Sequence, residues 1–428
     1  MVAHLLDLPD ALLTQILAAL PDPASLLQAM SASRALAAAA SDECWQAYSN
    51  GVAWRVRRQH SGDGSIETCA DHFRRAHTAA STMLLIGGDR GGTADEPEEM
   101  AVPLVEAFDY ASEVWLASPS VPPLSVASWR NAPCAACDRG IAYVVGGWED
   151  EEEEALADVL TFYVTRHRRR RTSSSAAGST LAWPRTQHRY RLDSSPRTYQ
   201  PLKLPDLPEA RCFAAATFDA AGHLWVVGGG NGMTRGAECL TSIVTIDPNA
   251  EVPIWQPFGG APLLAPRCGL SLAADGNHHA LYLCGGYSGG VTYQDTVEVL
   301  DMAGVEPGRL LPPMRHARSG CGAGIGPDGA LYIVGGSDDG SNMLSSCERY
   351  DPREGCWHAL PDLPTARGYL AAAFSPDGAL YAGGGCADGW GSPVDAFEAF
   401  DTRAGKWKIL PPLPQSRSNH AIVLASTQ

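Results

Sequence analysis

The sequence predicts a mainly β protein, a six-bladed β-propeller closed by its C-terminal strand and preceded by a small all-α domain. Three observations lead to this fold class. An apolar run that ends in Gly-Gly recurs six times after residue 80, and such recurrence is typical of repeat architectures. The repeat region begins and ends on strands that complete one another. The first 50 residues show helical periodicity instead.

The N-terminal region is predicted to form three short helices. The first covers residues 5–20, LLDLPDALLTQILAAL, with Pro9 in its first turn. Its apolar residues fall on one helical face: Leu12, Leu13, Ile16, Leu17 and Leu20. A second helix follows Asp22 as N-cap, and an Ala-rich third runs from Ser33 toward Trp45. Three helices of this size cannot bury all these leucines, so we expect an exposed apolar face, which usually marks a partner site.

These residues resemble the F-box pattern along its whole length. The resemblance implies that the helices dock on an Skp-type adaptor, which bridges to a cullin scaffold. The implied adaptor-binding residues are those that fill motif positions: Leu8, Pro9, Leu12, Ile16, Leu17, Leu20, Leu26, Leu27, Met30 and Trp45. Ala35-Leu36-Ala37 departs from the family pattern. The alternative is a three-helix cap packed on the propeller. We place the F-box at residues 1–50 and a helical connector at residues 51–80.

The repeats are the runs MLLIGG, AYVVGG, LWVVGG, LYLCGG, LYIVGG and LYAGGG, whose first glycines are Gly87, Gly146, Gly228, Gly285, Gly335 and Gly383. Each run is followed by an apolar residue before Asp, usually by Trp, and then by a Leu-Pro turn and an arginine. Four strand signals per repeat suit a propeller blade, and glycine permits close approach of a neighbouring blade or of the Trp. The repeats resemble kelch motifs over residues 81–428. The repeat after Asp301 has no Trp, and Leu310-Leu311 is expected to fill its place.

Counting strands predicts how the ring closes. The repeat region opens on a second strand, MLLIGG, and ends on a lone first strand, SNHAIVLA. Pairing these two strands would remove the exposed edges that invite aggregation. The innermost strands, such as CFAAA, CGLSLA, SGCGAG and YLAAAF, contain small residues that suit crowding around the central axis.

One interval between repeats is long and contains EDEEEE, RHRRRR and SSSAAGST. Its composition predicts a disordered insertion at about residues 165–188. VLTFYV and HRYRLD are both candidates for the third strand of this blade. The basic run from Arg166 to Arg171 fits a nuclear-import signal or a solvated loop.

An arginine precedes each Gly-Gly after the first by sixteen to eighteen residues, and another opens the final strand. We expect the six guanidiniums to ring one mouth of the central channel and to bind substrate, because arginine holds carboxylates and phosphates through paired hydrogen bonds. They are Arg130, Arg211, Arg267, Arg318, Arg367 and Arg417. The alternative is internal pairing with the third-strand residues Glu106, Glu298, Glu348 and Glu398. Arg130 and Arg211 lack such a glutamate, which makes them the stronger candidates. Acidic loops flank the same face, so a basic or mixed-charge target stays open.

The composition limits the class of function. A net charge of -16 argues against a generic nucleic-acid binder, and the sequence shows neither a signal peptide nor a membrane span. We therefore expect a protein of the cytoplasm, the nucleus or both, with its twelve cysteines as thiols. Cys134 and Cys137 have metal-ligand spacing but no second pair nearby, and the glycine-rich formulas at residues 286–290 and 324–329 fall in turns. No catalytic residue, metal or cofactor is predicted.

The function that follows is that of a substrate-recognition subunit of an Skp adaptor–cullin–F-box ubiquitin ligase, with an unknown protein bound by the propeller. The alternative is a non-catalytic kelch scaffold that acts outside a ligase, or a kelch-type enzyme. The N-terminal module distinguishes them, because a scaffold or an enzyme would not need an exposed F-box face.

Overall fold

The computed structural model divides the chain into two units, Met1–Ala80 and Ser81–Gln428. It describes only residues of the second unit: 82–89, 105–110, 113–116, 131–138, 141–148, 154–163, 189–191, 200–202, 204–232, 238–275, 280–289, 292–306, 308–376, 378–389 and 392–425. The expected F-box helices, the connector and the insertion at 165–188 lie outside these residues.

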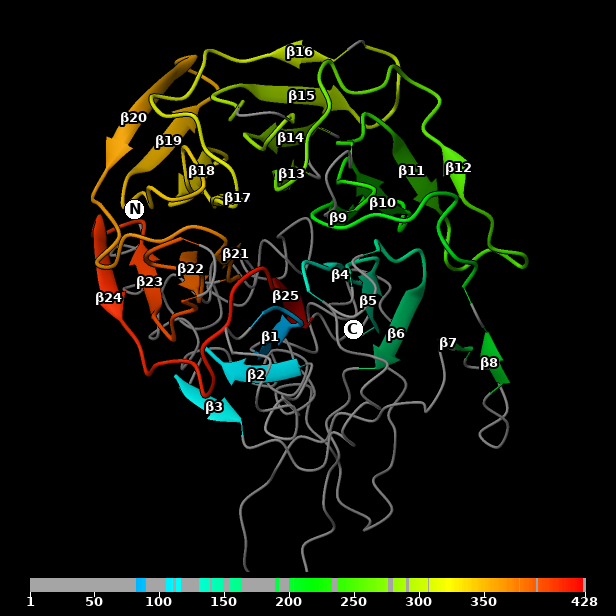
Figure 1. The fold of residues 1–428 in the computed structure, drawn as a ribbon, viewed down its shortest axis with the longest axis horizontal. Helices are drawn as coiled ribbons and strands as arrows, with labels where there is room; N and C mark the ends of the chain where they lie inside the picture. The colour runs from blue at the N-terminus through cyan, green and yellow to red at the C-terminus, as the bar shows by residue number, and fades with distance from the viewer. Residues whose placement is uncertain are drawn as a thin grey trace, which may run out of the picture. The chain divides into compact units, whose positions relative to one another are not determined.

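Six antiparallel sheets form the blades of a propeller (Figure 1). Blade 1 contains β1 (Thr82–Ile86), β2 (Val105–Asp109), β3 (Val114–Leu116) and β25 (Ala421–Ala425). Blade 2 contains β4 (Cys134–Asp138), β5 (Ile141–Val145) and β6 (Val159–Tyr163). Blade 3 contains β9 (Ala215–Phe218), β10 (Leu224–Val227), β11 (Ile243–Ile246) and β12 (Gln256–Pro257).

Blade 4 contains β13 (Ser271–Asp275), β14 (Ala280–Cys284), β15 (Val297–Asp301) and β16 (Arg309–Leu310). Blade 5 contains β17 (Gly322–Ile325), β18 (Leu331–Val334), β19 (Cys347–Asp351) and β20 (Cys356–Leu360). Blade 6 contains β21 (Ala371–Phe374), β22 (Ala379–Gly383), β23 (Phe397–Asp401) and β24 (Lys406–Ile409). A separate two-stranded sheet pairs β7 (Arg189–Arg191) with β8 (Gln200–Leu202). The predicted mainly β, six-bladed fold is confirmed.

The ring closes as predicted. In blade 1 the C-terminal strand β25 pairs antiparallel with β1, with Thr82 opposite Ala425 and Ile86 opposite Ala421. The innermost strands β25, β4, β9, β13, β17 and β21 each contact their two neighbours around the ring. Closure thus uses strands from the two ends of the repeat region, which leaves no innermost strand at an open edge.

The third strand of blade 2 is now assigned. β6, from the segment VLTFYV, pairs with β5 along its whole length, whereas part of the other candidate, HRYRLD, forms β7 in the separate sheet. Among the described residues no helix has the length and apolar character needed to cross a bilayer.

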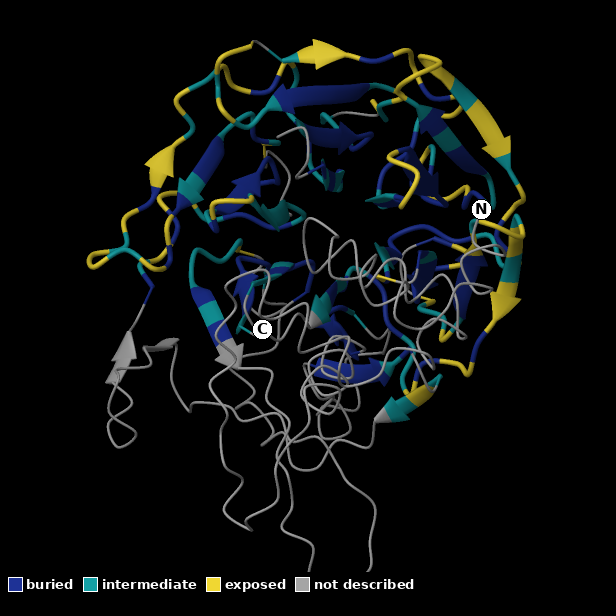
Figure 2. Ribbon diagram, turned by 180° about the vertical axis from the view of Figure 1, so that it is seen from behind, coloured by how far each residue is buried: buried dark blue, intermediate teal, exposed yellow. Residues whose placement is uncertain are grey.

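Among the described residues, six hydrophobic clusters fill the spaces between adjacent blades, one at each junction. Alternate residues of a second strand face opposite neighbours: Leu84 and Ile86 of β1 pack toward blade 2, and Met83 and Leu85 toward blade 6. Being covered on both faces explains why these strands are continuous apolar runs. Burial decreases outward, and exposed residues collect on the outermost strands (Figure 2).

Tryptophans in or next to the fourth strand join four of the blades to the blade before them. Their indole Nε1 groups donate hydrogen bonds to proline carbonyls at the end of the preceding blade: Trp115 to Pro411, Trp255 to Pro205, Trp357 to Pro312 and Trp407 to Pro361. In blade 4, Gly308 lies opposite Leu300, where other blades have Trp. The prediction that Leu310-Leu311 takes the place of Trp is wrong: Leu310 is 51% exposed, and Leu311 is buried toward blade 5, whereas the tryptophans pack against the preceding blade.

The glycine doublets lie in close contact with the backbone of the following blade. The second glycine donates its N–H to the carbonyl of the next blade's arginine, as Gly286 does to Arg318 at 2.9 Å. A Cβ on Gly285, whose φ is +61°, would lie 2.1 Å from the same carbonyl oxygen. The close approach predicted for the glycines is therefore made by this backbone, not by the Trp. In blade 6 the doublet is Gly384–Gly385, because Gly383 still belongs to β22.

The doublet contact can be separated from the effect of backbone conformation. Gly405 has a φ of +63°, nearly that of Gly285, but no atom lies within 4 Å of a Cβ placed there. We expect Gly405→Ala to lower the free energy of unfolding by about 1 kcal/mol, and Gly285→Ala by roughly 3 kcal/mol or more because overpacking is added. Urea unfolding of both variants measures the difference. Equal losses would show that the carbonyl contact contributes nothing.

Candidate functional site

One face of the propeller carries both the loops after the glycine doublets and the beginnings of the innermost strands; we call it the loop face. Antiparallel bridges join the residue after each doublet to the residue after an arginine, for example Cys268 with Tyr287 and Ser319 with Ser337. These bridges hold the loops over the central axis. The chain therefore places one loop per blade around a single opening.

The residue two positions after each arginine adopts a left-handed conformation in all six blades. These residues are Ala132, Phe213, Gly269, Gly320, Tyr369 and Asn419, with φ between 48° and 62°. Their backbones are linked from blade to blade: Phe213 N–H donates to Ala132 O at 3.1 Å, Gly269 to Phe213 at 2.9 Å and Gly320 to Gly269 at 2.8 Å. Four of the six are not glycine, and such strained positions persist only where surrounding structure fixes them.

The left-handed residues and the three that follow each of them line a central cavity of about 180 Å³. The walls come from all six innermost strands, as the small residues of these segments predicted. Alanine and glycine make up half of the lining residues, and Ser271, Asn419 and His420 are among the few with polar side chains.

The arginines do not ring this opening with free guanidiniums, which corrects our prediction. Arg211, Arg267, Arg318, Arg367 and Arg417 are at most 2% exposed. Arg318 is representative: its Nη1 donates to the carbonyls of Gly335 and Ser346 at 2.7 and 3.0 Å, and its Nη2 donates to Glu348 Oε1 at 2.6 Å. The guanidinium thus makes its hydrogen bonds within its own blade.

The internal pairing that stood as the alternative is present in four blades. The ion pairs join Arg267 to Glu298, Arg318 to Glu348, Arg367 to Glu398 and Arg417 to Glu106. Arg211 lacks a third-strand glutamate, as the sequence indicated, and instead donates to the Gly228 carbonyl and to Ser242 Oγ. It is no more accessible than the others. Arg130 lies outside the described residues.

Burial sets the electrostatics of these pairs. Desolvation raises the pKa of Glu298 and Glu398 and lowers the pKa of Arg267 and Arg367, while each partner opposes the shift of the other. His420 lies nearby, and burial together with Arg417 holds its pKa well below the usual range. A buried ion pair adds little net stability over an apolar pair, but the loss of one partner leaves the other charge buried and unpaired, which is strongly destabilising.

With the arginines buried, the loops determine the charge of the loop face. The described parts of the loops contain acidic but no basic side chains, among them Glu154, Glu238, Asp338, Asp339 and Asp388. Outside the described residues, the sequence between these strands contains the acidic runs 95–99 and 149–153 as well as Arg90 and Arg235. The balance is strongly negative, which favours a basic ligand.

Tyrosines gather on the loop face over blades 4 to 6. The rings of Tyr287 and Tyr293 lie 5.4 Å apart, and the Tyr293 hydroxyl lies against Gly340, where a Cβ would come within 2.6 Å of it. Tyr369 packs with Met343 and Cys386 beside this group. Tyrosine combines a large apolar surface with a polar tip and is enriched where proteins bind partners.

Cysteines contribute a close contact to the same face. Cys212, Cys284, Cys321 and Cys386 are buried. Cys268 is only partly buried, and its Sγ lies 2.8 Å from Sγ of Cys239 in the preceding blade. This thiol pair joins blades 3 and 4 beside Tyr287.

Our prediction from the sequence omitted these tyrosines because it relied on the charged residues. A usable signal was present: Tyr287 directly follows its glycine doublet, and Tyr369 stands two positions after its arginine. The position two after the arginine lines the central cavity in every blade. Tyr287 is partly exposed and Tyr369 is buried. The predicted adaptor residues from Leu8 to Trp45 lie outside the described part of the chain.

Comparisons with known proteins agree with this architecture. An F-box-like family model matches residues 5–50, and a kelch motif model matches residues 317–364 and 367–414, which hold blades 5 and 6. The chain joins an F-box-like domain to a kelch propeller. Among solved structures, the structure of YjhT is 17% identical with a TM-score of 0.51, over 72% of this chain and 91% of YjhT, a likeness of fold alone. A search of curated proteins found no match.

An F-box joined to a kelch propeller is typical of non-catalytic adaptor proteins. The geometry of the loop face agrees with a binding role, because its described part presents aromatic and acidic side chains around an opening lined by alanine and glycine. Aromatic and carboxylate side chains of this kind can make stacking contacts, hydrogen bonds and charge interactions.

The buried ion pairs give a stability prediction with an internal control. Arg318→Met leaves Glu348 buried without its cation and should lower the free energy of unfolding by about 3–5 kcal/mol. Lys408 pairs with Glu113 at 2.5 Å, but the two side chains are 59% and 41% exposed, so Lys408→Met should lower it by less than about 1 kcal/mol. Urea denaturation compares the two variants. A loss of similar size in both would mean that the Arg318 pair has no structural role.

Proposed function

We propose that this protein is a substrate-recognition subunit of an Skp adaptor–cullin–F-box ubiquitin ligase. The observation that carries the proposal is the combination of an F-box-like match at residues 5–50 with a closed kelch propeller. The leucine face of the F-box binds the adaptor, and the propeller binds the target. Ubiquitin transfer is then performed by other subunits, and this chain supplies proximity between target and enzyme.

In this proposal the target binds on the loop face. The group of tyrosines over blades 4 to 6 and the acidic loops that surround them support this location. Because the arginines are occupied within the blades, the preferred segment is basic, with lysine or arginine beside apolar residues, rather than the acidic segment expected from the arginines alone. Acidic residues around an opening also raise the association rate of a basic partner.

The adaptor prediction is tested by affinity capture of the tagged full-length chain. Ile16→Asp/Leu17→Asp places two charges on the predicted apolar face and should abolish recovery of the adaptor and cullin. Thr14→Asp/Gln15→Asp adds the same charge on the polar side of the same helix and should retain recovery. If the unaltered chain recovers neither subunit, the ligase function is wrong, and a kelch scaffold becomes the better description.

The choice of target is tested with synthetic peptide arrays of lysine/arginine-rich and aspartate/glutamate-rich segments. Asp339→Asn/Asp388→Asn removes two charges from exposed loop-face residues and should weaken basic peptides about fivefold at low salt, since each exposed charge pair contributes roughly 0.5 kcal/mol. Glu306→Gln/Asp401→Asn removes two exposed charges from the opposite face and should change nothing. Preference for acidic peptides would contradict the basic target.

A further inference from the structure

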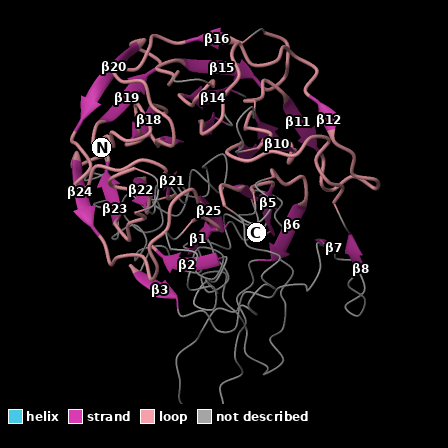
Figure 3. Ribbon diagram, viewed as in Figure 1, coloured by secondary structure: helices cyan, strands magenta, loops and turns pink. Residues whose placement is uncertain are grey.

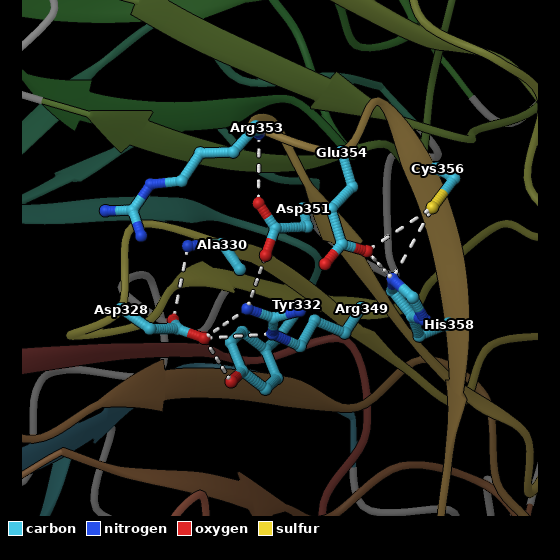
Figure 4. Close-up of polar contacts among 9 residues, drawn as sticks. All are labelled: Asp328, Ala330, Tyr332, Arg349, Asp351, Arg353, Glu354, Cys356 and His358. Atoms are coloured by element: carbon cyan, nitrogen blue, oxygen red, sulfur yellow. Dashed lines mark hydrogen bonds and ion pairs between the residues drawn. The ribbon is translucent and has the colours of Figure 1, made fainter.

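Blade 5 carries a cluster of three potential metal ligands away from the loop face. Glu354 lies in the turn before β20, and Cys356 and His358 lie on that strand, all three exposed. Their positions i, i+2 and i+4 place them on one side of the strand, while Trp357 between them packs toward the core. Figure 4 shows the three side chains converging from the outermost strand.

The distances among the three ligand atoms fit a single small cation. Cys356 Sγ lies 3.5 Å from His358 Nε2 and 3.7 Å from Glu354 Oε2. Ligands around a tetrahedral zinc ion, with bonds of about 2.3 Å to sulfur and 2.0–2.2 Å to nitrogen or oxygen, stand roughly 3.4–3.6 Å apart. His358 Nε2 and Glu354 Oε2 are 2.6 Å apart through a hydrogen bond. A metal would replace that hydrogen bond and increase the distance between these two atoms by less than about 1 Å.

The neighbouring charges also permit a cation. Arg349 lies directly opposite His358 on β19, and it would repel a metal if its charge were free. Instead its Nη2 lies 2.7 Å from Asp328 and 2.9 Å from Asp351, and its Nε donates to Asp328 at 2.9 Å. Two carboxylates thus bind the guanidinium of Arg349 (Figure 4). Arg349 therefore does not neutralise the negative charge of Glu354.

We propose that Glu354, Cys356 and His358 form a zinc-binding site on the outer strand of blade 5. A thiolate, an imidazole and a carboxylate are together the ligand types that zinc prefers, and the thiolate disfavours magnesium and calcium. Binding displaces the thiol proton of Cys356 to solvent, His358 binds through Nε2 as the neutral imidazole with its proton on Nδ1, and water completes the fourth position. In the sequence, only Cys134 and Cys137 stood out by metal-ligand spacing, whereas Glu354, Cys356 and His358 alternate along one strand.

The test uses Co²⁺ as a spectroscopic probe on the reduced full-length protein. A thiolate-bound cobalt ion gives a sulfur-to-metal charge-transfer band in the near ultraviolet, and Zn²⁺ should remove this band by displacing the cobalt. We expect one equivalent to bind to the unaltered chain. Cys356→Ser should abolish the band, and His358→Ala or Glu354→Gln should weaken binding by more than about tenfold. All three residues are exposed, so the variants should fold.

Cys137→Ser is the matched control, because Cys137 belongs to the other cysteine pair with metal-ligand spacing. It should leave the band unchanged. The proposal is overturned if stoichiometric Co²⁺ produces no thiolate band, if the band survives in Cys356→Ser, or if Cys137→Ser removes it. Unchanged affinity in both His358→Ala and Glu354→Gln would equally overturn the three-ligand site.

Discussion

At five described junctions between blades, the carbonyl of the arginine that begins one blade accepts a hydrogen bond from the glycine doublet of the blade before it, while the guanidinium of that arginine turns into its own blade. Only glycine fits, because a Cβ on the first glycine would lie 2.1–2.7 Å from the carbonyl oxygen. This contact fixes the spacing between neighbouring sheets. The apolar clusters between blades and the tryptophan–proline hydrogen bonds farther out depend on that spacing.

The same contact decides the chemistry of the loop face. Because the guanidiniums satisfy backbone carbonyls and third-strand glutamates, the most cationic residues of the repeats are withdrawn from ligands. What remains at the surface is supplied by loops that the repeat pattern does not constrain, namely tyrosines and carboxylates. The conserved geometry of the blade thus provides the scaffold, and the variable loops provide the surface for recognition, as is usual for loops held by a rigid frame.

The outer strands have more freedom than the inner ones. Residues of a fourth strand pair on one side only, and alternate side chains point into solvent. Chemistry can therefore be placed there without disturbing the core, as the Glu354, Cys356 and His358 cluster illustrates. The tryptophan between these residues keeps the strand anchored to the preceding blade through Pro312.

The sequence alone determined the six blades and the strand that closes them, because period and strand count are local properties of the chain, and it offered the four glutamates only as alternative partners of the arginines. The F-box assignment also came from sequence, through apolar spacing and resemblance. Only the tertiary structure decided where the guanidiniums point, since a side chain at the start of a strand can turn inward or outward without changing any spacing. It also decided that β6 rather than β7 completes blade 2, because both segments have strand-like sequences and only pairing with β5 distinguishes them.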